Sequence, residues 1–487
     1  MGRRVGRWVA CLLVAATGLV LGIRWHLLRG RQTPVFQSPA ASRRPSSPAV
    51  ERLRAGAAGA NVIIILMDAA AAGHFTSYGY ALNTTPNLAT FLDRSALLTE
   101  AYATGASTKP SVASLFTSQF PDTHGAVGVP SRLTRGSATL AECLKGAGYL
   151  TAAFSASASV SVSFGYGRGF SSFHEVFRDV GVEPTGLHPR HGPPQSVSGA
   201  LVLASVSRWL KEHYNQRLFA YIHFLEPHRP NNAPESFRQR FLAQRRGLGP
   251  KVEYDASLAY VDSLVGKLLG EMRASGLLDR SVVVVLADHG EAFGEHGRTG
   301  HSSTVYREMV RVPLAFHLPR RCGAQPRRRS EVFCLTDLMP TLLDLLRIAP
   351  PKTMQGRSRL GLLAGEQEGE PSFAVSRAIG SDTTGGQKDP TQVSYALRVP
   401  RYTLLLAEMG RRVELYDRDQ DPQEQHNLAK DRQDLVGKLQ AQFAAWAATQ
   451  RGRPVVLPGG RVFAAEGKVS DMDEQTRRQL KSLGYLE

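Results

Sequence analysis

The run 281–301, SVVVVLADHGEAFGEHGRTGH, constrains the fold more strongly than any other part of this chain. Its unbroken apolar stretch, 282–286, predicts a strand that is buried on both faces, as strands of parallel sheets are. Such a strand delivers Asp288 and His289 to its carboxyl end, where open α/β sheets bind their ligands. A carboxylate beside an imidazole suits a hard or borderline divalent cation, so the run predicts a metal site. An ordinary polar turn is the alternative.

A second apolar run weakens that alternative. Residues 61–68, NVIIILMD, also have the pattern of a buried strand, and this strand ends in Asp68. Because the carboxyl ends of parallel strands lie at one edge of a sheet, we expect Asp68 and Asp288 to share one cation. Carboxylate oxygens bind such ions at about 2.0–2.6 Å, so the two carboxylates must lie within about 8 Å of each other.

Residues 105–125, GASTKPSVASLFTSQFPDTHG, place a hydroxyl at the expected start of a helix. Pro110 favours the first turn, so Thr108 would lie beside free backbone amides and the positive end of the helix dipole. That position binds anions, and a hydroxyl there is a candidate nucleophile. From local sequence alone, a threonine that merely caps the helix is the better explanation.

Residues 217–230, RLFAYIHFLEPHRP, predict a further strand followed by polar side chains. His223, Glu226 and His228 gather at its end, which makes the cluster a candidate binding site. Each of the three residues, taken alone, is equally well explained by a structural role.

Strands and helices alternate over 61–370, which predicts a doubly wound α/β sheet. A long helix is expected over 254–276, and we interpret its Asp262 as a capping or ion-pair residue and not as a catalyst. Three short apolar runs within 393–417 then predict an antiparallel meander, followed by another helix. We therefore divide the folded chain into a large α/β domain, 61–370, and a smaller α+β subdomain, 371–487.

The amino terminus has the pattern of an export signal. Within 1–31, arginines precede about 16 mostly apolar residues, which matches a signal peptide or a short signal anchor. We favour the anchor because no clear cleavage site follows and because Trp8 and Trp25 suit a membrane interface. Residues 32–60, rich in Pro, Ser, Ala, Gly and Arg, predict a disordered linker. We expect an exported protein, anchored at the periplasmic or outer face of the cell membrane.

The net charge of +17 and the four cysteines give less information about the function than the motifs do. The arginines are scattered through loops and linkers without a nucleic-acid motif, so we expect no nucleic-acid partner. Cys322 and Cys334 flank a basic loop and could pair in an exported protein. Cys143 is expected to be a small buried hydrophobe.

Taken in order, these segments resemble the sulfatases, members of the alkaline phosphatase superfamily. The resemblance covers roughly 61–430 and rests on NVIIILMDA, TTPNLATFLDRS, TKPSVASLFTSQFPDTHG, YDASLAYVDSLVGKLL, VVLADHGEAFGEHG and ELYDRDQDPQEQHNL. It implies a large mixed α/β sheet sandwiched by helices, a smaller C-terminal sheet, and a metal site that binds the tetrahedral anion of a sulfate or phosphate ester. The metal would be calcium, magnesium, manganese or zinc.

The resemblance also implies roles for individual residues. His228 resembles the family's substrate-facing histidine, and His301 lies where some phosphoethanolamine transferases have a further metal histidine. The implied metal ligands are Asp68, Thr108, Asp288 and His289. The residues expected to be catalytic are Thr108, Lys109 and His228. Those expected to bind the substrate are His223, His228 and His301.

The chain departs from the family pattern at several positions. Ala69, Val112 and Ser302 stand where many sulfatases have an aspartate, an arginine and a lysine. Thr108 stands where sulfatases oxidise a cysteine or serine to the formylglycine aldehyde, which a β-branched threonine cannot form. Phosphoethanolamine transferases use threonine nucleophiles. We therefore expect a metal-dependent hydrolase or transferase that acts on a small-molecule, glycan or lipid ester, with phosphate favoured over sulfate. The alternative is a non-catalytic relative that binds an anionic ligand.

Overall fold

The computed structural model describes residues 46–128, 130–133, 135–181, 198–231, 233–243, 249–367, 372–379, 393–407, 410–450 and 472–482. The expected export segment, 1–31, lies outside these ranges, and so do residues 32–45 of the expected linker. None of the helices within the described ranges combines the length and the apolar composition that a membrane span requires.

The predicted disordered linker, 32–60, is wrong over its last part. Residues Pro48–Ala57 form helix α2, and the Ser47 hydroxyl caps it by accepting a hydrogen bond from the Val50 amide at 3.2 Å. Val50 and Leu53 are buried in the main hydrophobic core. These two apolar residues lie on one face of the helix, but the alanines, glycines and arginines around them made the pattern hard to recognise.

Within the described ranges, the larger sheet has nine strands in the order β10-β2-β9-β6-β1-β5-β3-β4, and β11 also pairs with β2. Its central strands run parallel, whereas β9 is antiparallel to both β6 and β2. The mixed α/β sheet that the family resemblance implied is therefore confirmed. The alternation of elements did not reveal the reversed direction of β9. The strands are β1 Asn61–Met67, β2 Ala96–Tyr102, β3 Leu150–Ser155, β4 Ser172–Glu175, β5 Leu218–Phe224, β6 Ser281–Ala287, β9 Arg311–His317, β10 Arg327–Arg329 and β11 Phe333–Cys334.

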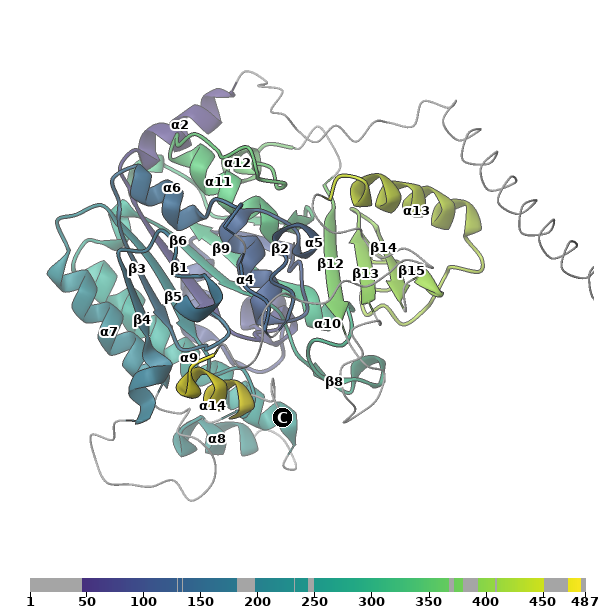
Figure 1. The fold of residues 1–487 in the computed structure, drawn as a ribbon, viewed down its shortest axis with the longest axis horizontal. Coiled ribbons are helices and arrows are strands. Elements are labelled where there is room, and N and C mark those ends of the chain that lie inside the picture. Colours follow the sequence, from purple (N-terminus) through teal and green to yellow (C-terminus); the bar gives the residue numbers. More distant parts are fainter. Residues whose placement is uncertain are drawn as a thin grey trace, which may run out of the picture.

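Helices flank this sheet (Figure 1) and pack in two groups: α3, α7 and α8 contact α9, while α6 and α11 contact α4. The α-helices of this part are α3 Pro86–Leu92, α4 Thr108–Thr117, α5 Pro121–His124, α6 Leu140–Gly146, α7 Ser198–Glu212, α8 Glu235–Leu242, α9 Pro250–Ala274, α10 Arg307–Val310, α11 Leu338–Leu345 and α12 Leu360–Ala364. Short 3₁₀ helices are η1 Ala72–His74, η2 Thr76–Tyr78, η3 Val162–Phe164, η4 Val176–Gly181, η6 Leu278–Arg280, η7 Glu295–Gly297, η8 Arg320–Cys322 and η9 Leu335–Asp337. A small ribbon joins β7 Ala292–Phe293 to β8 Thr299–Gly300.

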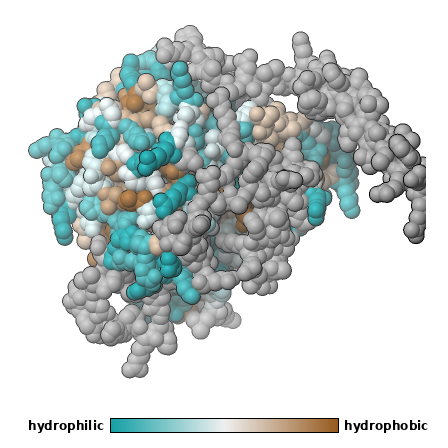
Figure 2. Space-filling model, in the orientation of Figure 1, coloured by the Kyte–Doolittle hydropathy of each residue, from teal (hydrophilic) through white to brown (hydrophobic). Residues whose placement is uncertain are grey.

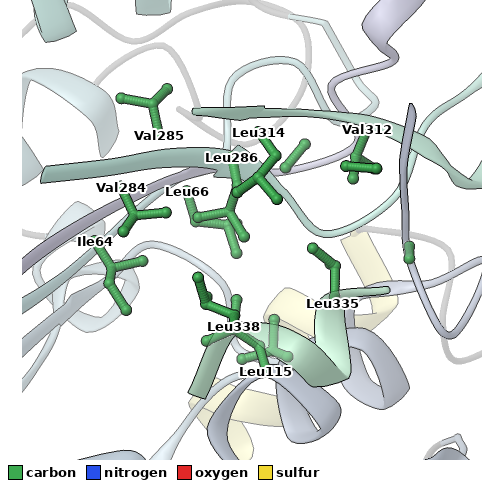
Figure 3. Packing of buried hydrophobic residues seen from close by; sticks show 14 of the residues in the cluster. Ile64, Leu66, Leu115, Val284, Val285, Leu286, Val312, Leu314, Leu335 and Leu338 are labelled. Carbon is green, nitrogen blue, oxygen red and sulfur yellow. The ribbon is translucent and has the colours of Figure 1, made fainter. Parts of the chain in front are cut away.

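The packing in Figure 3 fixes α4 to the centre of the sheet. Leu115 of α4 and Leu338 of α11 lie close to Leu66 of β1 and Leu286 of β6, and all four side chains are fully buried. Burying one such side chain contributes about 1.5–3 kcal/mol. This packing therefore holds the amino terminus of α4 beside the ends of the central strands.

The smaller sheet is antiparallel, with the strand order β12-β13-β14-β15, and stands beside the larger domain (Figure 1). The predicted meander within 393–417 is confirmed, while β12 was not predicted. Phe443 and Trp446 of α13 pack on Tyr395, with ring centroids 5.3 and 6.1 Å from its ring. The elements of this part are β12 Ala374–Ile379, β13 Val393–Arg398, β14 Tyr402–Ala407, β15 Arg412–Asp417 and α13 Gln433–Ala447. Helix α14, Glu474–Ser482, contacts η4 of the larger domain instead.

Cys322 and Cys334 are free buried thiols, so the disulfide considered from the sequence does not form in this structure. Cys143 is also free and only partly buried. On the face seen in Figure 2, hydrophilic residues spread over much of the described surface, with small hydrophobic patches between them. The exposed large hydrophobic side chains among the described residues are Val162 and Tyr214. Single exposed apolar residues of this kind are ordinary and by themselves mark no interface.

Asp262 caps a neighbouring helix, as the sequence indicated. From the middle of α9, its carboxylate accepts hydrogen bonds from the backbone amides of Leu88 at 2.8 Å and Asn87 at 3.1 Å, in the first turn of α3. Replacing Asp262 by alanine is expected to lower the free energy of unfolding by about 2 kcal/mol, because a cap is lost and buried donors are left without an acceptor. Urea denaturation measures the change.

Asp93 provides the matched control for this prediction. It is exposed at the opposite end of α3, so Asp93→Ala should change the free energy of unfolding by no more than about 0.5 kcal/mol. Equal destabilisation by the two substitutions would contradict the capping role of Asp262.

Candidate active site

Two carboxylates and an imidazole meet at the carboxyl edge of the larger sheet. Asp68 follows β1 and Asp288 follows β6, while His223 lies near the end of β5, and these three strands are adjacent and parallel. One possible ligand atom from each residue lies within 4.8 Å of the others, and all three side chains are fully buried. The expected convergence of Asp68 and Asp288 is thus confirmed, and His223, which was expected to face the substrate, joins them.

Hydrogen bonds fix the two carboxylates. The His223 Nε2–H donates to Asp68 Oδ2 at 3.0 Å. Asp288 Oδ1 accepts from the backbone amides of Ala69 at 3.2 Å and His289 at 3.0 Å. Among the described residues, the buried Asp288 Oδ2 has no hydrogen-bond partner. Buried polar atoms are nearly always satisfied, so an orphaned carboxylate oxygen here fits a bound cation.

The loop after Asp68 is held by a tyrosine that the sequence did not indicate. Ala69 has a left-handed backbone with φ of 55°, which is unusual for a residue other than glycine. The Tyr254 hydroxyl donates to the Ala69 carbonyl and accepts from the Ala71 amide, both at 2.8 Å. These two bonds clamp the turn that aims the Asp68 side chain.

Thr108 is the first residue of α4, and Ser107 occupies the capping position before it. Its hydroxyl lies 3.3 Å from Asp68 Oδ1 and 3.2 Å from His289 Nε2. The structure therefore brings Thr108 and His289 to the carboxylate cluster, as the resemblance implied. The simpler explanation, that Thr108 only caps its helix, does not account for this placement.

Buried charges of both signs adjust the ionisation of the cluster. Burial opposes the charge on Asp68, but the hydrogen bond from His223 and the nearby imidazoles hold its pKa well below the usual range. Burial and the neighbouring Asp68 charge raise the pKa of Asp288. Burial opposes the charge on His289, but the two carboxylates outweigh it and raise its pKa. A divalent cation would relieve the repulsion between the carboxylates, so the residues present fit such an ion.

Two further imidazoles lie beside this group. The ring centroid of His301 is 4.6 Å from that of His289 and 4.7 Å from that of His228. The His301 Nδ1–H donates to Glu291 Oε2 at 2.8 Å, and the His228 Nδ1–H donates to the Arg229 carbonyl at 2.5 Å. Both rings are thereby oriented through Nδ1. Sequence reasoning missed Glu291, whose one signal was its position three residues after Asp288.

The Lys109 side chain makes its described contacts elsewhere. Its Nζ donates to the Ser131 carbonyl at 3.2 Å and lies 3.1 Å from the centroid of the Phe164 ring. Burial and the nearby Arg132 hold the pKa of Lys109 well below its ordinary value. These contacts do not support the catalytic role expected for Lys109, because an aromatic ring and a carbonyl beside α4 hold its side chain.

Glu226 is also outside the cluster. Its Oε1 accepts hydrogen bonds from the Ser198 hydroxyl at 2.9 Å and from the Gly199 amide, at the start of α7. These bonds satisfy amino-terminal donors of that helix. Of the three residues that gather after β5 in the sequence, His223 and His228 reach the site and Glu226 has a structural role.

The smaller sheet supports the loop that precedes Thr108. The Arg377 amide of β12 donates to the Thr104 carbonyl at 2.8 Å, and the Ala106 amide donates to the Arg377 carbonyl at 3.2 Å. The Ser376 hydroxyl donates to the Ala103 carbonyl at 2.6 Å. The unpredicted strand β12 therefore positions the start of α4.

A buried histidine braces α4 from within the fold. His124 accepts from the Ala126 amide at Nδ1, at 3.1 Å, and its Nε2 lies 3.0 Å from the Ser114 hydroxyl. Burial, reinforced by the charge of Arg377, lowers the pKa of His124 to about 3. Unfolded histidine titrates near 6.5, so between these values the unfolded chain binds a proton that the folded protein excludes. His124 must therefore reduce stability as the pH falls below about 6.5.

The lowered pKa of His124 predicts a measurable difference in stability between the wild type and a His124 variant. Between pH 7 and pH 5, the free energy of unfolding should fall by about 2 kcal/mol more in the wild type than in His124→Gln. Urea denaturation at both pH values tests it, because the other titrating groups are common to the two proteins. An identical pH dependence would show that the pKa of His124 is the same in the folded and unfolded states and would contradict the lowered pKa.

Two family models and several curated proteins match parts of this chain. Residues 60–348 match the family model described as sulfatase, and residues 294–448 match the model described as N-sulphoglucosamine sulphohydrolase, C-terminal. Arylsulfatase K of Mus musculus is 29% identical over 191 residues, which are 38% of this chain and 34% of that protein. Delta 4,5-hexuronate-2-O-sulfatase of Bacteroides thetaiotaomicron is 34% identical over 159 residues, 31% of each protein. The matched region spans about a third of the length of these curated relatives.

Solved structures of other proteins superpose on most of this chain. Phosphonate monoester hydrolase of Agrobacterium radiobacter superposes with a TM-score of 0.68 at 20% identity, covering 80% of this chain and 96% of that one. A 2-O GAG sulfatase superposes with a TM-score of 0.63 at 20% identity, covering 80% and 92%. At this level of identity the similarity establishes the fold.

Proposed function

This chain belongs to the sulfatase family, and we propose that it is an exported, metal-dependent enzyme that cleaves or transfers a phosphate or sulfate ester with Thr108 as its nucleophile. One observation carries the proposal: the Thr108 hydroxyl lies at the amino terminus of α4, within 3.3 Å of Asp68 Oδ1 and 3.2 Å of His289 Nε2. A hydroxyl among metal-ligand side chains and free helix amides is placed to meet an anionic ester.

A bound divalent cation would neutralise charge on the ester and ease ionisation of a nearby hydroxyl. The chain's own residues account for the other steps. Thr108 Oγ1 forms a bond to phosphorus or sulfur while the bond to the ester oxygen breaks, and Asp68 Oδ1 accepts the hydroxyl proton. The amides of the first turn of α4 stabilise the negative charge of the transferring group.

His228 and His301 are placed to serve the leaving group. Burial lowers the pKa of His228, whereas an anionic ester beside it would favour its protonated form. A protonated imidazole can donate to the departing alkoxide, and the oriented His301 can bind an oxygen of the ester. Attack by water on the Thr108 ester then completes hydrolysis, while attack by another hydroxyl completes transfer.

Threonine at the nucleophile position favours phosphorus over sulfur, because it cannot supply the aldehyde that formylglycine sulfatases require. The curated relatives are named as an arylsulfatase and a hexuronate sulfatase, so aryl and glycan esters belong among the test substrates. Lipid phosphoesters belong there too if residues 1–31 hold the protein at a membrane.

The test uses metal-reconstituted protein with a panel of aryl phosphate, phosphodiester and sulfate esters. We expect turnover of at least one ester and faster turnover of phosphate than of sulfate. Binding of the same anions without turnover of any of them would favour the alternative, a non-catalytic anion-binding relative.

Export and anchoring rest on residues 1–31 and are proposed separately from the chemistry. Fractionation of cells that make the full chain should recover it with membranes, released by detergent and accessible to protease from outside. A shortened form free in the periplasm would refute the anchor and leave export intact.

A further inference from the structure

We propose that His223 is a direct metal ligand and that it makes the site select zinc, or a similar nitrogen-preferring cation, over calcium. The inference takes the metal site of the proposed function as its premise. Its test measures metal binding and not turnover, so either idea can fail without the other.

The position of His223 supports direct ligation. Its Nε2 lies 3.0 Å from Asp68 Oδ2, and a ligand atom of His223 lies with those of Asp68 and Asp288 inside one 4.8 Å group. Parallel pairing sets this position, since His223 of β5 is opposite Leu66 of β1, two residues before Asp68. An ion at the group would bind Nε2 of the other neutral tautomer, whose proton is on Nδ1, where the Tyr221 hydroxyl oxygen can accept it.

The orientation of the ring agrees with this role. The Tyr221 hydroxyl lies 3.1 Å from His223 Nδ1, and both residues are fully buried. His289 has the corresponding arrangement, because its Nδ1–H donates to the Gly290 carbonyl at 2.8 Å. Metal-binding histidines commonly have their second nitrogen held in this way, which directs Nε2 to the ion.

The set of donors indicates which ion binds best. Calcium takes six to eight oxygen ligands, while zinc accepts a small mixed set of imidazole nitrogens and carboxylate oxygens. Asp68 and Asp288 supply carboxylates, Thr108 a hydroxyl, and His223 and His289 nitrogens. Ala69, next to Asp68, has no side-chain oxygen that could bind the ion, and its backbone amide only donates a hydrogen bond to Asp288. Two imidazoles in a site poor in oxygen donors favour zinc.

The competing explanation is that His223 stays outside the coordination sphere and only orients Asp68 through a hydrogen bond. In that case the donors left for the ion would be mostly oxygens, and exchanging His223 would affect zinc and calcium alike. Metal selectivity therefore separates the two explanations, whereas loss of metal affinity alone does not.

The experiment titrates metal-stripped full-length protein with zinc and with calcium by calorimetry, comparing wild type with His223→Gln. We expect the wild type to bind zinc more tightly than calcium, and His223→Gln to lose at least about 100-fold in zinc affinity with a much smaller change for calcium. His317→Gln is the matched control. His317 lies on β9 opposite Val283, near the amino end of β6, and so away from the carboxyl edge of the sheet where the metal site lies. It should bind both ions as the wild type does.

Cobalt substitution supplies an independent readout. The visible absorption of bound cobalt depends on its ligands, so it should change in His223→Gln and stay unchanged in His317→Gln. If His223→Gln does not fold, His223→Asp replaces the nitrogen by an oxygen and should move the preference toward calcium. An unchanged zinc-to-calcium ratio and an unchanged cobalt spectrum in a folded His223 variant would overturn the proposal.

Discussion

Replacing Thr108 by valine is expected to reduce turnover by at least about 10³-fold while the fold and the metal content stay close to those of the wild type. Valine keeps the branched shape of the side chain, so the packing at the start of α4 should survive. What is lost is the hydroxyl of Thr108, which lies beside both Asp68 and His289. Steady-state kinetics, circular dichroism and metal analysis of the purified variant measure the three quantities.

Thr108→Ser is the matched control, because it keeps the hydroxyl and removes only a methyl group. It should retain most of the activity. Near-normal turnover in Thr108→Val would mean that a water molecule attacks the ester and that Thr108 has only a positioning role.

Removing the metal should reduce turnover about as much as Thr108→Val does. Dialysis against a chelator is expected to abolish turnover, and Asp288→Asn is expected to weaken metal affinity by more than about 100-fold, because a charged ligand is lost from the site. In the metal-free state the same variant should unfold at a temperature equal to or above that of the wild type. The reason is that Asp68 and Asp288 repel each other there, and this repulsion contributes to the raised pKa of Asp288.

Calorimetry, kinetics and thermal denaturation with and without chelator test these statements together. Asp279→Asn, an exposed change on η6, is the control and should leave all three measurements unaltered. Full activity of the chelated wild type would contradict a metal-dependent mechanism.

The strands of the site could be predicted because a short run of sequence is enough to show that each is buried. A run such as 282–286 has no polar residue, so it must be buried on both faces, and parallel strands must end at one edge. Those two facts bring Asp68 and Asp288 together without knowledge of the rest of the fold.

The local sequence could not show the surroundings of residues whose contacts depend on which distant neighbour faces them. His223 was expected to bind substrate, but the pairing of β5 with β1 places it against Asp68. Lys109 was expected in the site, yet Phe164, far along the chain, holds its side chain. Glu291 was overlooked because its function depends on the position of His301. Strand order and loop packing determine such contacts, and neither can be predicted from a short stretch of sequence.

The stereochemical course of the reaction tests the central claim most directly. A phosphate or sulfate ester made chiral at its central atom with oxygen isotopes is turned over, and the configuration of the product is determined. Attack by Thr108 followed by attack on the Thr108 ester requires two in-line displacements, so we predict net retention of configuration. Inversion would show a single displacement by water or by the acceptor, and would contradict a covalent intermediate on Thr108.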